Sequence, residues 1–136
     1  MFRNIFDRMR GLGREDGQAM VEFALVVPIL LTIVLAGIQF GTVYLQWQQL
    51  SSATSEGARR AVVSRRYDDR ETRIETAVVN AAPSLEDDIT VDSIVSDWTP
   101  GSPVTVTASY PIVVNILGMH VVDKRITNSR TMRVEQ

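Results

Sequence analysis

The sequence predicts an α+β protein: a long N-terminal transmembrane α-helix that continues into a small domain with a second helix and an antiparallel sheet of three or four strands. Three observations support this fold class. An apolar run carries no charged residue from Phe23 through Ser55. Apolar residues then recur at helical spacing between Ile74 and Leu85, and the segment 103–114, "PVTVTASYPIVV", alternates apolar and polar residues as a strand does.

Composition excludes several functional classes. The chain has 136 residues and a formal net charge of -2, without the basic excess expected of a nucleic-acid-binding protein. There is no cysteine, so disulfides, thiolate metal sites and cysteine nucleophiles are excluded. The single histidine, His120, leaves at most one imidazole for acid-base chemistry. No cofactor and no small-molecule substrate are expected.

The apolar run is long enough to cross a membrane. From Phe23 to Leu45, roughly 23 residues at about 1.5 Å each span about 34 Å, against about 30 Å for a hydrocarbon core. We therefore expect residues 23–45 to form a transmembrane helix, which continues past the membrane into "SSATSEGARRAVV".

Charges before this helix predict its orientation. The leader 1–17 contains four arginines close to the membrane segment, which favours a cytoplasmic N-terminus: Arg3, Arg8, Arg10 and Arg14. The long helix is expected over 18–66 and an extracytoplasmic α+β domain over 67–136. Tyr44 and Trp47 are either interfacial aromatics at the outer membrane boundary or ordinary residues of a helix face.

Three residues of the run bear on helix packing. Pro28 lacks an N–H, which predicts a kink or a loosened turn in the helix. Gly37 and Gly41 form a G-x-x-x-G pair, which allows another helix to approach closely or simply reflects the high glycine content of membrane helices. Gln39 lies between them and is able to hydrogen-bond across a helix pair.

The position of the charged leader argues against an ordinary secretory signal. Such signals have an apolar core of about 7 to 15 residues, followed by small residues at the cleavage site. Here the core is longer, and "QWQQL" follows it. The better processing site, Gly17, lies before the apolar run.

This arrangement, "G-QAMVEF-ALVVPILL", resembles the processing motif of type IV prepilins of the tight-adherence kind. In that motif a peptidase cuts after a glycine, and a glutamate and an aromatic residue occupy the fifth and sixth mature positions. The matching residues are Gly17, Gln18 as the first mature residue, Glu22 and Phe23. The helix with "SSATSEGARRAVV" and the strand-rich end further resemble TadE-like pseudopilins.

The resemblance implies a non-enzymatic minor pilin or pseudopilin of the bacterial inner membrane that takes part in assembly or initiation of a Tad (Flp) pilus. The bulk subunits of that family are much shorter than this chain, which is why a minor subunit is expected. The implied partners are other major and minor pilins, Tad assembly platform proteins and the prepilin peptidase, with functions in adhesion and protein secretion.

The position of Glu22 also has a physical explanation that does not depend on the resemblance. A carboxylate deep in a membrane helix costs roughly 2.5 to 3.5 kcal/mol, so an acid there usually has a partner or a function. Cutting after Gly17 would create an α-amino group on Gln18, with a pKa of about 7.7 to 8.0 in model compounds. Either this amine, on a neighbouring subunit, is the counter-ion, or Glu22 lies at the headgroup boundary beside Arg14.

The remainder predicts a small domain. Asp68 or Asp69 is a candidate N-cap of a helix that ends near Ala82, before Pro83. Its apolar positions are Ile74, Ala77, Val78, Ala81 and Leu85. Strands are expected in "ITVDSIVSDW", "PVTVTASYPIVV" and "ITNSRTMRVE", with a turn at 99–103. The long helix is expected to cover the sheet through Leu50, Ala58, Ala61 and Val62.

No catalytic or metal constellation stands out. The acidic run Glu86–Asp88 lacks the spacing of a known calcium loop and predicts a solvated turn. "ILGMHVVDK", with His120 and Asp123, predicts a loop between strands. No phosphate-binding loop, nucleophile elbow or zinc-protease motif is present. The alternative to a pilin is an uncleaved, single-pass scaffold or binding module of a secretion or envelope complex; an enzyme is the third option.

Overall fold

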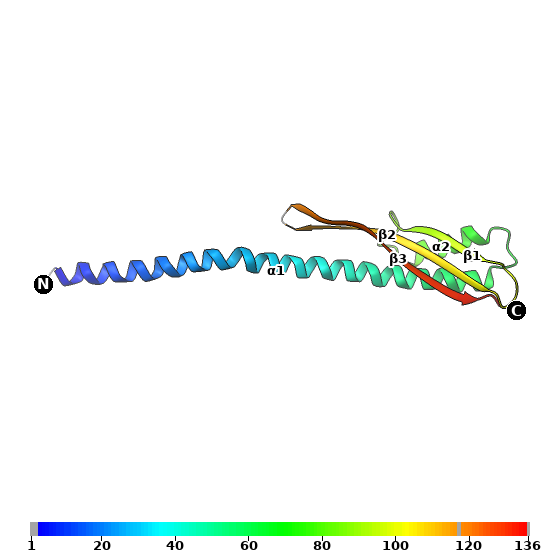
Figure 1. Ribbon diagram of the computed structural model, residues 1–136, viewed down its shortest axis with the longest axis horizontal. Coiled ribbons are helices and arrows are strands. Elements are labelled where there is room, and N and C mark those ends of the chain that lie inside the picture. Colours follow the sequence, from blue (N-terminus) through cyan, green and yellow to red (C-terminus); the bar gives the residue numbers. More distant parts are fainter. Residues whose placement is uncertain (1–2, 117, 136) are drawn as a thin grey trace. The chain divides into compact units, whose positions relative to one another are not determined.

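The described part of the chain forms two helices and one three-stranded antiparallel sheet (Figure 1). The computed structural model describes the backbone of residues 3–116 and 118–135, and the side chains of these residues except those of 3–16, Ile116 and His120. The order along the chain is α1 (Arg3–Val63), α2 (Arg70–Ala81), β1 (Thr90–Ser96), β2 (Pro103–Ile116) and β3 (Met119–Arg133). The predicted α+β class, with a long N-terminal helix, is confirmed.

Helix α1 belongs to two compact units. The first unit ends at Ile38, and the second comprises residues 39–136. The helix continues through Pro28 without a break in its α-helical conformation. The leader residues from Arg3 onward are helical as well, while the side chains of the four leader arginines lie outside the described residues.

The core of the second unit forms where the last turns of α1 meet α2 and the sheet. Leu50, Ala58 and Ala61 are fully buried there, as predicted, and Val62 packs against them. At Gly57 the backbone of α1 approaches α2 closely, because a Cβ built on this residue would clash with Cγ2 of Val78. Small residues on this face therefore let α1 pack closely against its neighbours.

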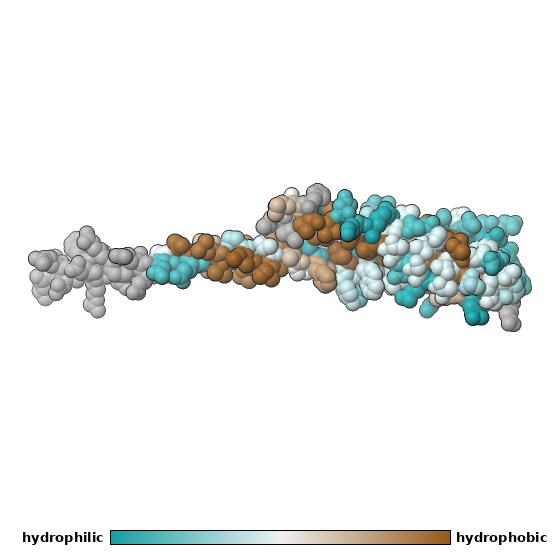
Figure 2. All heavy atoms as spheres, viewed as in Figure 1, coloured by the Kyte–Doolittle hydropathy of each residue, from teal (hydrophilic) through white to brown (hydrophobic). Residues whose placement is uncertain are grey.

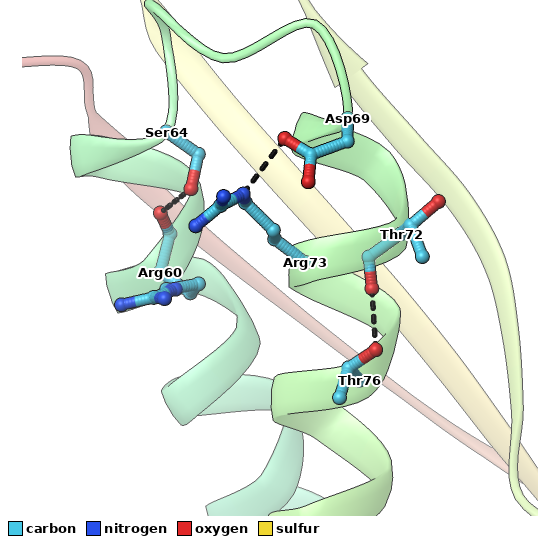
Figure 3. Close-up of polar contacts among 6 residues, drawn as sticks. All are labelled: Arg60, Ser64, Asp69, Thr72, Arg73 and Thr76. Atoms are coloured by element: carbon cyan, nitrogen blue, oxygen red, sulfur yellow. Dashed lines mark hydrogen bonds and ion pairs between the residues drawn. The ribbon is translucent and has the colours of Figure 1, made fainter.

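Helix α2 is amphipathic, with Ile74 and Val78 fully buried. It ends at Ala81, just before Pro83, as expected. Asp69 occupies the N-cap position, but its carboxylate makes no cap hydrogen bond. It instead accepts a hydrogen bond of 2.7 Å from Nε of Arg73, one turn along (Figure 3). This hydrogen bond lowers the pKa of the Asp69 carboxyl.

The connection from α1 to α2 is closed by local hydrogen bonds. The hydroxyl of the buried Ser64 donates a hydrogen bond of 2.6 Å to the carbonyl of Arg60 near the end of α1 (Figure 3). The buried hydroxyl and this carbonyl therefore each have a partner. Within α2, the Thr76 hydroxyl donates in the same way to the Thr72 carbonyl at 2.7 Å. Both hydroxyls are thus bonded to the carbonyl four residues earlier in the chain.

Strand β2 is central in the order β1-β2-β3, and both pairings are antiparallel. Its inward face is the predicted one: Val104, Val106 and Ala108 are fully buried, and Tyr110 packs against the core. The opposite face carries hydroxyls that pair across to β3, Thr105 with Thr131 at 2.8 Å and Thr107 with Ser129 at 2.9 Å. The sheet is therefore apolar toward the helices and polar on its other side.

The predicted loop at "ILGMHVVDK" is wrong. Strand β2 continues to Ile116 and β3 begins at Met119, so this segment forms the two arms of a tight hairpin. Gly118 lies in the turn with a φ of 81°, a conformation that favours glycine. The predicted turn at 99–103 is confirmed by the hydrogen bond from the Ser102 N–H to the Thr99 carbonyl.

Gly57→Ala is expected to destabilise the second unit. The added methyl group meets the stiff, buried side chain of Val78, and overpacking of this kind costs about 1–3 kcal/mol. The gain in helix propensity, about 1 kcal/mol, offsets only part of this cost. Thermal unfolding of the full chain in detergent is therefore expected to show a net loss of about 1 kcal/mol in the free energy of unfolding.

Val78→Ala tests the proposed cause. In the Gly57→Ala/Val78→Ala double variant the clash is relieved, so the combined loss should be smaller than the sum of the single losses. The exposed Ser52→Ala substitution on α1 is the control and should change stability little. Additive losses would contradict the clash.

Candidate functional site

The apolar part of α1 is the most unusual surface of the protein. Its large apolar side chains are exposed, and on the face seen in Figure 2 they form a brown surface along the helix. The exposed apolar residues of the first unit are Met20, Val21, Phe23, Leu25, Val26, Ile29, Leu30, Leu31, Ile33, Val34 and Ile38. The segment is long and apolar enough to cross a membrane, and none of its most apolar stretch is buried by the residues that the structure describes. A helix that is apolar all round needs lipid or another protein around it.

Glu22 lies at the start of this surface. Nε2 of Gln18 donates a hydrogen bond of 3.1 Å to Oε1 of Glu22, one helical turn later. Phe23, the next residue, is 69% exposed. The structure thus brings three residues of the predicted motif together on one stretch of helix. Gly17 precedes them, exposed and within the same helix.

The glycines of the apolar segment that were predicted to affect helix packing have open space beside them. A Cβ on Gly37 or on Gly41 would meet none of the described residues within 4 Å. At Pro28, whose own N–H is missing, the carbonyl accepts a hydrogen bond of 2.8 Å from the Thr32 hydroxyl. The glycine pair therefore leaves room along the helix for a partner outside the chain.

Gln39 contacts the sheet rather than another helix. Its Nε2 donates a hydrogen bond of 3.1 Å to the carbonyl of Asn115, near the tip of the β2–β3 hairpin. The amide therefore has a partner within its own chain. From the sequence, Gln39 was only identified as able to hydrogen-bond across a helix pair, and the long-range contact with position 115 could not be predicted from the local pattern.

Two aromatic residues mark the end of the apolar run. The rings of Tyr44 and Trp47 stack with their centroids 6.2 Å apart and an interplanar angle of 26°. Both residues are about half exposed, and they lie within the second unit. Exposed, amphipathic rings at this point suit the boundary between hydrocarbon and headgroups.

The described residues do not assemble an evident reaction centre. Among them, no group of three or more His, Asp or Glu side chains is placed to hold a metal ion. The acidic run Glu86–Asp88 forms an exposed turn after α2. His120 pairs with Asn115 through the β2–β3 ladder, and its side chain lies outside the described residues.

Comparison with known proteins supports the resemblance seen in the sequence. Residues 17–59 match the family described as TadE-like protein, so the similarity to this family is confirmed over that segment. The TadE-like family is a family of structural proteins associated with Tad pili, and the similarity to it is limited to this segment. No curated protein and no solved structure matches the chain.

Val34→Lys is expected to impair membrane insertion. Val34 lies exposed near the middle of the apolar segment, where a lysine costs about 2.5–3.5 kcal/mol on insertion scales. The fraction of full-length protein that resists carbonate extraction from membranes should fall markedly. Ser52→Lys, at an exposed position beyond the segment, is the matched control and should leave extraction unchanged. Equal behaviour of the two variants would argue against a spanning helix.

Proposed function

We propose that the protein is a minor pilin or pseudopilin of a Tad pilus that takes part in assembly or initiation of the fibre. Residues 23–45 hold it in the inner membrane, with the leader 1–17 in the cytoplasm and residues 67–136 outside. A prepilin peptidase cuts after Gly17. Its partners are other pilins and the proteins of the assembly platform.

One observation carries this proposal. The TadE-like match begins at Gly17, the residue before the proposed cut, and extends through the apolar segment into the packed part of α1. The exposed apolar helix supports the same conclusion, because in a pilus such a helix passes from lipid to the helices of neighbouring subunits without entering water.

The proposed cut explains the place of Glu22. Cleavage would make Gln18 the first residue of α1, so that Glu22 would lie little more than one turn from a helix N-terminus, where carboxylates are favoured. The new α-amino group would supply a cation at the same end. We propose that Glu22 pairs with this amine on a neighbouring subunit, which sets the axial register of the two helices.

The glycine pair would serve lateral contact in this scheme. Gly37 and Gly41 lie one turn apart with open space over both, so a second helix is able to approach the backbone closely. Pro28 interrupts the main-chain hydrogen bonding and eases adjustment of the helix as its surroundings change from lipid to protein.

Processing is tested by the N-terminal sequence and intact mass of the protein from native membranes. The expected start is Gln18, and Gly17→Ala should abolish it, leaving the leader attached. Gly13→Ala is the matched control, since it changes a leader glycine four residues earlier and should leave the Gln18 start intact. An unprocessed Met1 start in a functional complex would overturn the cut and favour the uncleaved scaffold.

Glu22→Gln is expected to leave insertion and cleavage intact but to reduce piliation at least about tenfold. Removing one partner of a buried ion pair costs about 3–5 kcal/mol, more than the roughly 1.4 kcal/mol that corresponds to a factor of ten. The measurement is the number of pili per cell by electron microscopy.

Gln18→Ala is the control for Glu22→Gln. It removes the side-chain hydrogen bond to Glu22 within the chain but retains the proposed α-amine. Piliation close to normal in Gln18→Ala, together with its loss in Glu22→Gln, would support pairing with the amine. Equal losses in both variants would instead assign Glu22 to the contact within its own helix.

A further inference from the structure

The tip of the β2–β3 hairpin is an apolar surface that the domain core does not use. No Asp, Glu, Lys or Arg occurs from Pro111 through Val122. Val113, Met119 and Val121 are 49%, 64% and 56% exposed, respectively. The charges return together at 123–125, with Asp123, Lys124 and Arg125.

Two hydrogen bonds define where this hairpin lies along the part of α1 in the second unit. Near its tip, the Asn115 carbonyl accepts from Gln39. Farther up β3, Arg130 donates to the hydroxyl of Ser51 at 3.2 Å. Within the second unit, the tip of the hairpin therefore lies beside the first residues of this part of α1, near Gln39, and the base of the hairpin lies beside its packed, polar residues near Ser51.

The length of helix from Gln39 to the end of the apolar run is close to the length of strand from Asn115 to the level of the charged residues of β3. From Gln39 to Leu45, six residues at about 1.5 Å each give about 9 Å along the helix. From Asn115 back to Ile112, the partner of Lys124, three residues at about 3.3 Å each give about 10 Å along the strand. The charged segment 123–125 consequently lies close to the level of Tyr44 and Trp47, the aromatic pair at the end of the apolar run.

We infer that the hairpin tip inserts into the outer leaflet of the membrane in which α1 is anchored. This inference rests on the membrane-spanning part of the proposed function and adds a second lipid contact to it. The ligand is a lipid surface. Val113, Met119 and Val121 enter it, while Lys124 and Arg125 remain among the headgroups.

Backbone hydrogen bonding limits the depth of insertion. Beyond Ser109, the last β2 residue paired with β1 at Thr90, the outer edge of β2 has no neighbouring strand in the described sheet. Open strand edges are not tolerated in the hydrocarbon centre. An insertion of about 5–10 Å, typical of interfacial segments, matches the level of Gln39, whose amide satisfies the Asn115 carbonyl there.

The absence of cysteine from the chain permits a direct test with single labelled sites. Full-length Met119→Cys carries an environment-sensitive NBD fluorophore in nanodiscs of phosphatidylcholine and phosphatidylglycerol. We expect blue-shifted emission, quenching by spin-labelled lipid and loss of quenching by aqueous iodide. Thr127→Cys, exposed farther along β3, is the aqueous control, and Val34→Cys is the control within the lipid. Val121→Cys repeats the measurement at a second exposed position in case the first variant fails to fold.

The possible results are distinguishable. Iodide quenching at position 119 equal to that at 127, with position 34 still quenched by lipid, would overturn the hairpin insertion and leave the anchor intact. Protection of position 119 from both quenchers would mean that protein, such as a helix of a second copy, covers the tip, and would also overturn it. Iodide quenching at position 34 would overturn the membrane anchor and the hairpin insertion together.

Discussion

The need to keep one continuous helix out of water along most of its length governs this protein. Between Phe23 and Leu45, helix α1 exposes large apolar side chains, and within the described part of the chain none of its most apolar stretch is buried. Beyond that point the same helix becomes one wall of a core, and after Leu50 its fully buried residues are mostly small: Ala53, Thr54, Ala58 and Ala61. Large apolar residues suit a fluid surrounding that conforms to any shape, whereas small ones suit the fixed side chains of α2 and the sheet. The two parts of α1, before and after Leu45, are thus suited to two different surroundings.

Much of the fold could be predicted because its periodic patterns are simple. The alternation around Val104 and Val106 identified the buried face of β2, and the spacing of Ile74 and Val78 identified that of α2. Contacts that depend on how separate segments of the chain come together were harder to predict from the sequence. The closeness of Gly57 to Val78 depends on how two helices cross. The extension of β2 and β3 toward the Gly118 turn depends on pairing between two segments in which apolar and polar residues do not alternate regularly.

The residues of the candidate site likewise include some whose arrangement could be predicted from the sequence and some whose contacts could not. The run from Gly17 to Phe23 could be recognised from residue order alone, and its TadE-like match covers the same segment. The bond from Gln39 to Asn115 could not be, because the two residues are 76 positions apart and neither belongs to a recognisable motif. Asp69 shows a subtler limit: its place before α2 was predictable, but Arg73 competes successfully with the helix N–H groups for its carboxylate.

The two outer strands of the sheet differ in how they discourage aggregation. Strand β1 is short and contains a register shift between Val91 and Ser93, which interrupts the regular array of main-chain donors and acceptors that an incoming strand would need. Strand β3 is long, but it carries Lys124, Arg125, Arg130 and Arg133, so two copies that met along this strand would bring like charges together. Growth of an extended sheet from copy to copy is therefore disfavoured at both edges. A protein that polymerises by helix contacts would retain the sheet as a separate unit on each subunit, safe from the irreversible stacking to which exposed strands are prone.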